Sequence, residues 1–122
     1  MIDPLMRGLR ARPLLRSYLY VLIGPKTFSS AEFAALAFRR ELRAILVGEP
    51  SGERPNGYGE VRELVLPNSQ LAMQYSTKFF RMVKDADPPA LEPDIRSTAT
   101  LDDALAGRDP VLEAALRHSV QH

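Results

Sequence analysis

The order of patterns between residues 18 and 50 constrains the fold more than any other part of the sequence. Residues 18–23 (YLYVLI) are β-forming and apolar on both faces, which predicts a strand buried on both sides. A Gly24-Pro25 pair ends this run, and residues 44–47 (AILV) predict a second buried strand. Apolar positions at helical spacing lie between the two strands, so we expect parallel strands joined by a right-handed crossover. The apolar stripe of the expected helix consists of Phe33, Leu36, Ala37 and the aliphatic stem of Arg40.

Small hydroxyl residues, among them Ser29 and Ser30, occupy the turn between the first strand and the helix. Loops at the carboxyl ends of buried strands are where α/β proteins place their ligands. Backbone N–H groups at the start of a helix can stabilise an oxyanion, so either serine is a candidate nucleophile. The alternative is that one of them only caps the helix, with Glu32 in the first turn favouring the helix dipole. A phosphate-binding P-loop is excluded, because that motif requires a glycine directly before the lysine and Pro25 precedes Lys26 here.

Residues 1–17 are basic, and Asp3-Pro4 predicts the start of a short helix that ends before Pro13. We interpret its arginines as a solvated helix face. A transit peptide is disfavoured because the stretch is short and poor in Ser and Thr. A nucleic-acid-binding arm is disfavoured because the rest of the chain is balanced in charge.

Shorter patterned segments follow residue 50 and are separated by turn-forming residues. Residues 51–59 (SGERPNGYG) are rich in Gly and Pro and predict a loop. Residues 61–66 and 71–77 predict an antiparallel hairpin, which residues 78–83 extend.

Two helices are expected near the C-terminus. Thr100 is suited to cap the first, residues 101–106, and Gly107 to end it. Asp109-Pro110 starts the second, and residues 119–122 are expected to fray. The side chains expected to face inward from the last helix are Val111, Leu112, Ala115 and Leu116.

Composition excludes several classes of function. The chain has no cysteine, which excludes disulfides and cysteine-based metal sites. A net charge of +1 gives no general attraction to nucleic acid or acidic membranes. No run of about 18 apolar residues is present, so we expect no membrane span. Asp85 and Asp87 lack a further oxygen-rich ligand run, so we expect no metal site.

An ordered set of segments resembles the C-terminal processing (tail-specific) serine peptidases of family S41. The segments are residues 27–33 (TFSSAEF), 43–52 (RAILVGEPSG), 66–69 (LPNS), 91–94 (LEPD) and 107–112 (GRDPVL). The resemblance extends from Leu19 to Leu116 and implies an α/β fold of the ClpP/crotonase type, a mixed sheet flanked by helices. The glycine-rich oxyanion loop of the family would lie before residue 1, which implies an incomplete peptidase core, the C-terminal half of the catalytic domain. We therefore divide the chain into a basic segment or short helix (1–17), a peptidase-like domain (18–118) and a tail (119–122).

The resemblance places the nucleophile at Ser29, three residues before Glu32, and the backbone N–H of Ser30 in the oxyanion site. In one branch of the family the general base is a lysine, and its position is occupied by Arg54 in this chain. Arginine stays protonated and cannot accept the serine proton. We therefore expect Arg54 to bind a substrate carboxylate through its planar fork, the alternative being a surface arginine without a ligand.

A second branch of the family uses a histidine from an earlier segment, together with an acid shortly before the Pro-Asp motif. By position this acid is Asp87, or Asp85 as the weaker match, and it would orient the base. The two histidines of this chain, His118 and His122, lie at its C-terminal end and do not match the family's position.

The resemblance thus implies a serine-type peptidase that hydrolyses peptide bonds through Ser29, acts on peptides or proteins and uses no cofactor. The alternative, favoured by the missing base, is an inactive peptidase-like module that binds peptides or mediates assembly. An acyl-CoA enzyme of the crotonase fold is a weaker alternative, because nothing suggests a pantetheine site. A half-domain would expose a sheet edge, so we expect self-association or a preceding segment that covers it. The cysteine-free chain fits the cytoplasm as given, and export would require a leader on a longer precursor.

Overall fold

The computed structural model describes residues 3–12 and 19–121. Its helices and strands are, in chain order, α1 (Asp3–Arg10), β1 (Tyr20–Ile23), α3 (Ser30–Leu42), β2 (Ile45–Gly48), β3 (Asn56–Val65), β4 (Ala72–Arg81), β5 (Ile95–Arg96), α4 (Leu101–Leu105) and α5 (Pro110–Gln121). The expected strand residue Tyr18, the helix stop at Pro13 and His122 lie outside the described residues. Within the described residues, no helix has the length and apolar character needed to cross a membrane.

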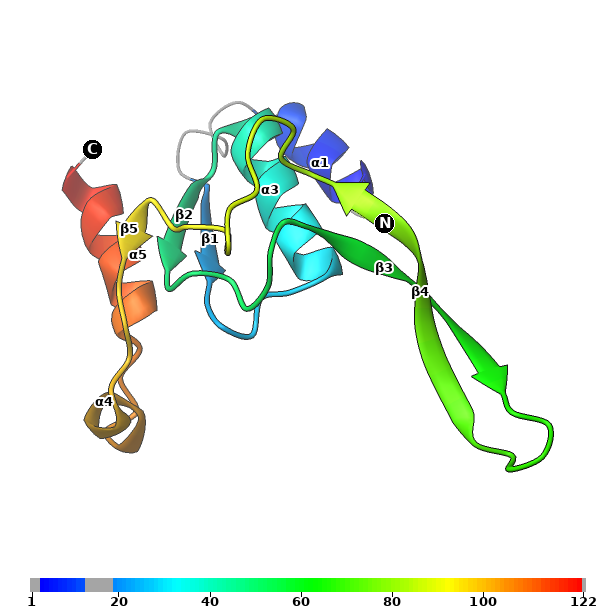
Figure 1. The fold of residues 1–122 in the computed structure, drawn as a ribbon. Helices are drawn as coiled ribbons and strands as arrows, with labels where there is room; N and C mark the ends of the chain where they lie inside the picture. The colour runs from blue at the N-terminus through cyan, green and yellow to red at the C-terminus, as the bar shows by residue number, and fades with distance from the viewer. Residues whose placement is uncertain (1–2, 13–18, 122) are drawn as a thin grey trace.

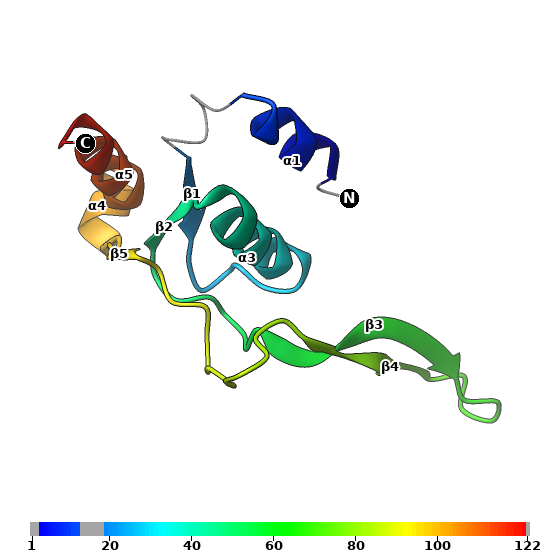
Figure 2. The same ribbon diagram turned by 90° about the horizontal axis from the view of Figure 1, so that it is seen from above.

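A three-stranded parallel sheet in the order β1-β2-β5 forms the centre of the molecule. Tyr20 lies opposite Ile45 and Ile23 lies opposite Gly48, so the two strands predicted on either side of the helix are parallel neighbours. Figure 2 shows α3, with α1 outside it, on one face of this sheet and α5 on the other. The α/β class expected from the sequence is confirmed.

The core lies between the sheet and α3, where Ile23, Leu36, Leu46 and Leu91 pack together with Ala35. Leu46 and Val47 on the central strand are fully buried, as predicted. The prediction that the first strand is buried on both sides is wrong for Leu22, which is 44% exposed. The physical reason is that β1 is an edge strand, with β2 on one side only.

The buried stripe of α3 also differs from the prediction. The buried positions are Glu32, Ala35, Leu36 and Leu42, whereas Phe33 and Ala37 are half-buried and Arg40 is exposed. Hydrophobicity alone predicted that Phe33 begins the buried stripe. In the structure the first buried residue of α3 is Glu32, which carries a carboxyl group. Phe33 packs instead against Phe80 of β4, with 5.4 Å between the ring centroids.

The strands β3 and β4 form an antiparallel hairpin that projects from the body as a long arm (Figure 1). Parallel and antiparallel pairings are thus both present, but they lie in two separate sheets rather than in one mixed sheet. The expected loop is shorter than predicted, because β3 already begins at Asn56. The buried Asn56 side-chain amide donates to the carbonyls of Val83 (3.0 Å) and Ala86 (2.9 Å) and so fixes the base of the arm.

The Pro-Asp segment supplies the third strand of the parallel sheet, which the sequence patterns did not predict. The Asp94 N–H donates to the Leu46 carbonyl at 2.8 Å, and the Asp94 carboxylate accepts the Leu46 N–H at 2.8 Å. The other carboxylate oxygen of Asp94 accepts a hydrogen bond from Arg39 of α3. This motif therefore joins strand β2 to helix α3.

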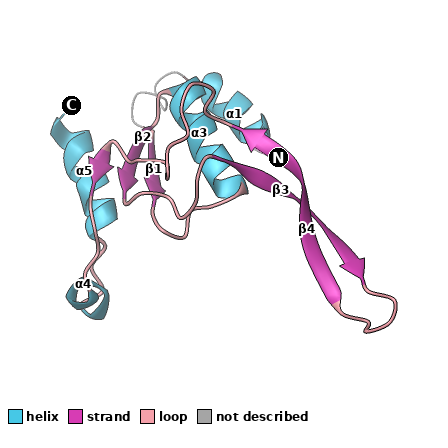
Figure 3. Ribbon diagram, viewed as in Figure 1, coloured by secondary structure: helices cyan, strands magenta, loops and turns pink. Residues whose placement is uncertain are grey.

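The C-terminal helices follow the capping signals. Thr100 and Asp103 form a reciprocal capping box at the start of α4, and Gly107 follows its end with φ 67°. Helix α5 continues through Gln121, so the segment expected to fray is helical up to that residue. Figure 3 shows helix α5 beside the parallel sheet. Of the side chains expected to face inward from α5, Ala115 is buried, whereas Leu112 and Leu116 are 45% and 56% exposed.

Candidate active site

Two loops lie side by side at the carboxyl edge of the parallel sheet. Residues 24–29 follow β1 and residues 49–55 follow β2. The Gly52 N–H donates to the Thr27 carbonyl at 2.9 Å, and the two backbones approach so closely that a Cβ on Gly52 would lie 2.1 Å from the Pro25 carbonyl oxygen. The contact between these loops therefore requires glycine at position 52.

Ser29 holds an unusual backbone conformation at the sharp turn from the β1 loop into α3, with φ 53° and ψ −126°. This region is sparsely populated by residues other than glycine and costs about 1–3 kcal/mol. Ser29 occupies the N-cap position, but its side chain makes no capping hydrogen bond. The capping alternative is thus not realised by the Ser29 hydroxyl, which remains on an exposed residue at the turn.

A carboxylate from the loop after β2 accepts a hydrogen bond at the N-terminus of α3. Glu53 accepts a hydrogen bond from the Ser29 N–H, the role that a capping box would give to Glu32. Ser30 is the first residue of the helix, so its N–H has no intrahelical acceptor. The helix start therefore presents donors beside the Ser29 side chain.

Glu32 is completely buried beneath the turn. The Ser51 hydroxyl donates to its Oε1 at 2.6 Å and accepts the Leu91 N–H at 2.7 Å. The Oε2 atom of Glu32 has no hydrogen-bond partner among the described residues. Burial raises the pKa of Glu32 and the negative charge of Glu53 adds to this, whereas the Ser51 hydrogen bond works in the opposite direction. Glu32 thus connects the first turn of α3 to the loop after β2.

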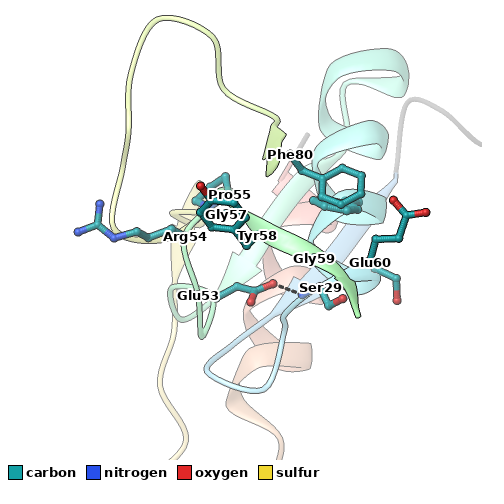
Figure 4. A pocket seen from close by; sticks show the side chains of 11 residues that line it. Ser29, Glu53, Arg54, Pro55, Gly57, Tyr58, Gly59, Glu60 and Phe80 are labelled. Atoms are coloured by element: carbon teal, nitrogen blue, oxygen red, sulfur yellow. Dashed lines mark hydrogen bonds between the residues drawn. The ribbon is translucent and has the colours of Figure 1, made fainter. Parts of the chain in front are cut away.

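A cavity of about 310 Å³ opens directly at Ser29 (Figure 4). The glycines of β3 line one side, and the rings of Phe33 and Phe80 close another. The lining residues are Ser29, Ser30, Phe33, Glu53, Arg54, Pro55, Gly57, Tyr58, Gly59, Glu60 and Phe80. Both serines singled out from the sequence therefore face one pocket, which is large enough for a side chain or a short peptide segment.

The structure places Arg54 and Asp87 against each other. The guanidinium of Arg54 lies 3.1 Å from the Asp87 carboxylate, and both side chains are mostly exposed. Figure 4 shows the Arg54 side chain pointing away from Ser29. Asp87 also accepts a hydrogen bond from Asn56 at 3.3 Å, which ties it to the base of the hairpin. Their roles in substrate binding and in orienting a base stay predictions.

Comparison with known families adds to this geometry. The model of peptidase family S41 matches residues 8–97, which is most of the chain. The chain belongs to peptidase family S41. Members of this family are serine peptidases, so a peptidase-like function is the one that membership supports. No curated protein matches the chain.

The resemblance to the S41 family implies a lysine or a histidine as the general base of the reaction. Among the described residues that line the cavity, there is no lysine and no histidine. Lys26 lines a different hollow together with Glu49 and Asp109. The Nδ1 atom of His118 lies 2.8 Å from the Tyr20 hydroxyl, at the end of β1 opposite to the Ser29 turn.

Within residues 3–12 and 19–121, no three His, Cys, Asp or Glu side chains gather closely enough to hold a metal ion.

The site of this S41 chain contains residues that sequence reasoning missed, above all Glu53, Ser51, Tyr58 and Phe80. The Gly-x-Gly spacing before Glu60 was the one local signal that this strand lines a cavity. Nothing in the local sequence indicated that Phe80, on the next strand, would pack against Phe33 of α3.

Proposed function

We propose that this chain carries the nucleophile of a serine peptidase, the Oγ atom of Ser29. The observation that supports it most is the strained backbone of Ser29 at a strand-to-helix turn that opens on a cavity. The same kind of turn exposes the nucleophilic serine of α/β hydrolases. The Ser30 N–H, free of intrahelical acceptors, stabilises the oxyanion of the tetrahedral intermediate.

In the proposed reaction, Ser29 Oγ bonds to the carbonyl carbon of the scissile peptide bond and its proton passes to a base. The C–N bond then breaks and the amine leaves with that proton, and water hydrolyses the acyl-enzyme. The base comes from a second copy of the chain, with Asp87 orienting it. The Arg54 guanidinium, close to the cavity, binds a substrate carboxylate in exchange for Asp87, which fits cleavage near the C-terminus of a protein substrate.

A second function is supported by the cavity itself, whose described lining contains neither lysine nor histidine. In this alternative the chain is an inactive S41 module that binds peptides at the cavity or mediates assembly. Fold and family membership are compatible with both functions, because the chemistry depends on the site.

Fluorophosphonate labelling, followed by intact mass, tests the proposal. We expect one adduct on the chain and none on Ser29→Ala. The matched control is Ser69→Ala, in the turn of the distant hairpin, which should label like the unchanged chain. Labelling that grows faster than linearly with protein concentration indicates a base from a second copy. No adduct at any concentration contradicts the enzyme and favours the binding module.

A further inference from the structure

Two carboxylates flank the cavity at Ser29. Glu53 and Glu60 both line it, and none of the ion pairs between described residues involves either of them. Figure 4 shows Glu53 on one side of Ser29 and Glu60 on the other. The backbone at Glu60 is held in a left-handed conformation, φ 57°, and its carbonyl accepts the Thr77 hydroxyl at 2.7 Å. The position of Glu60 is therefore fixed by the hairpin.

The positive charges nearest to the cavity are engaged elsewhere. Arg54 lines the cavity, but its guanidinium pairs with Asp87 and points away from Ser29. The Lys78 ammonium lies 4.9 Å from the centroid of the Phe80 ring and is absent from the cavity lining. The rim of the cavity thus carries two negative charges that no ion pair between described residues neutralises.

Three aromatic rings complete the lining, those of Phe33, Tyr58 and Phe80. Such rings bind the aliphatic stem of a long basic side chain, and their faces attract cations. An aromatic wall with carboxylates at its rim suits a group that is apolar along its length and positive at its tip.

We infer that the cavity takes a lysine or arginine side chain of the substrate, next to the bond that Ser29 attacks. This inference rests on the proposed function for the position of the bond, but the binding of the cation depends only on the cavity. The stem packs against Phe33 and Phe80, and the charged tip lies between Glu53 and Glu60. An acidic side chain is excluded by repulsion from both carboxylates.

The first experiment uses tripeptidyl diphenyl phosphonates whose residue next to phosphorus is lysine, norleucine or glutamate. Ser29 Oγ forms a bond to phosphorus, and one phenoxide leaves as phenol with the serine proton. We expect the lysine reagent to label about tenfold faster than norleucine, as two exposed carboxylates and ring contacts allow. Glutamate should be slowest, and about 0.5 M salt should weaken the preference.

The second experiment measures binding without chemistry. Ser29→Ala is titrated with fluorescent Gly-Gly-X-Gly-Gly amides in which X is lysine, norleucine or glutamate, read by anisotropy. Glu53→Gln combined with Glu60→Gln should bring lysine and norleucine to equal affinity. The control Glu63→Gln removes one carboxylate charge farther along β3 and should leave the lysine preference intact.

The outcomes separate the two proposals. Labelling at Ser29 without a lysine preference overturns this inference and leaves the proposed function standing. No labelling at all, together with lysine-selective binding that depends on Glu53 and Glu60, overturns the proposed function and supports the cation site. Failure of every peptide to bind, or equal binding of lysine and norleucine, overturns the cation site.

Discussion

Ser51→Ala removes a single oxygen atom, and we expect it to lower the stability of the folded chain strongly. The Ser51 hydroxyl donates to the buried Glu32 and accepts the Leu91 N–H, so Ser51→Ala removes this hydrogen-bond partner from both groups. Each buried polar group left unsatisfied costs about 1–3 kcal/mol, and more when it is charged. We therefore expect Ser51→Ala to lower the free energy of unfolding by about 4 kcal/mol at pH 8.

The loss should depend on pH with a definite sign. Burial raises the pKa of Glu32 in the folded chain, so the contribution of Glu32 to stability is complete below the ordinary carboxyl pKa. That contribution is lost as the pH rises through the folded pKa. The Ser51 hydroxyl opposes this rise, so its removal raises the pKa of Glu32 further, and each added unit costs about 1.36 kcal/mol once Glu32 ionises. The destabilisation should therefore be larger at pH 8 than at pH 5.

Urea unfolding followed by circular dichroism at both pH values measures this effect. Ser119→Ala is the matched control, because its hydroxyl donates to Leu116 within the partly exposed helix α5 and should cost no more than about 0.5 kcal/mol. In a Glu32→Gln background the extra loss at pH 8 should disappear. A Ser51→Ala loss below about 1 kcal/mol, or one that is equal at both pH values, would refute the reasoning.

Three further predictions concern the backbone, a helix cap and the apolar edge. Gly48→Ala should lower the free energy of unfolding by at least about 3 kcal/mol in chemical denaturation, because φ is 128° and the added Cβ would lie 2.1 Å from the Ile23 carbonyl oxygen. The control Gly8→Ala, with open space around the added Cβ, should be neutral or stabilising. Equal effects of the two substitutions would contradict this prediction. Hydrogen bonds from Thr100, with a smaller contribution from Arg108, lower the pKa of Asp103 to about 2. The stabilisation that Asp103 adds is therefore complete above its ordinary pKa and is lost as the pH falls through about 2. An NMR titration of Asp103 measures this pKa, and a midpoint near 4 would disprove the prediction. We also propose that a second copy covers β1 and the exposed face of α5, so light scattering should show an oligomer that Leu116→Arg dissociates and Leu105→Arg on α4 does not, and a monomer at high concentration would count against it.

Much of the fold could be predicted from the sequence, because the interactions that determine these elements join residues close together in the chain. The strand–helix–strand order, the Thr100 cap and the helix end at Gly107 depend on neighbours within a few residues, and the structure has all three. The ordered motifs also identified the S41 family and drew attention to Ser29. These features follow from backbone propensity and capping, which a single sequence displays directly.

The same local signals failed where two patterns competed. The hydrophobic stripe of α3 favoured Phe33 over Glu32, since a carboxylate is rarely buried. Ser51 donates a hydrogen bond to that carboxylate, and Ser51 belongs to another loop. Likewise Leu22 reads as a core residue, yet its exposure is decided by the position of β1 at the edge of the sheet.

The sequence by itself therefore determined the family, the order of most elements and the turn that carries Ser29. Tertiary structure alone decided the strained backbone of Ser29, the ion pair between Arg54 and Asp87, and the cavity between α3 and the hairpin. The physical reason is that each of these depends on contacts between segments that are distant in the chain. Such contacts form only when the parallel sheet brings the carboxyl ends of β1 and β2 to one edge, and the strength of each contact depends on which groups meet there.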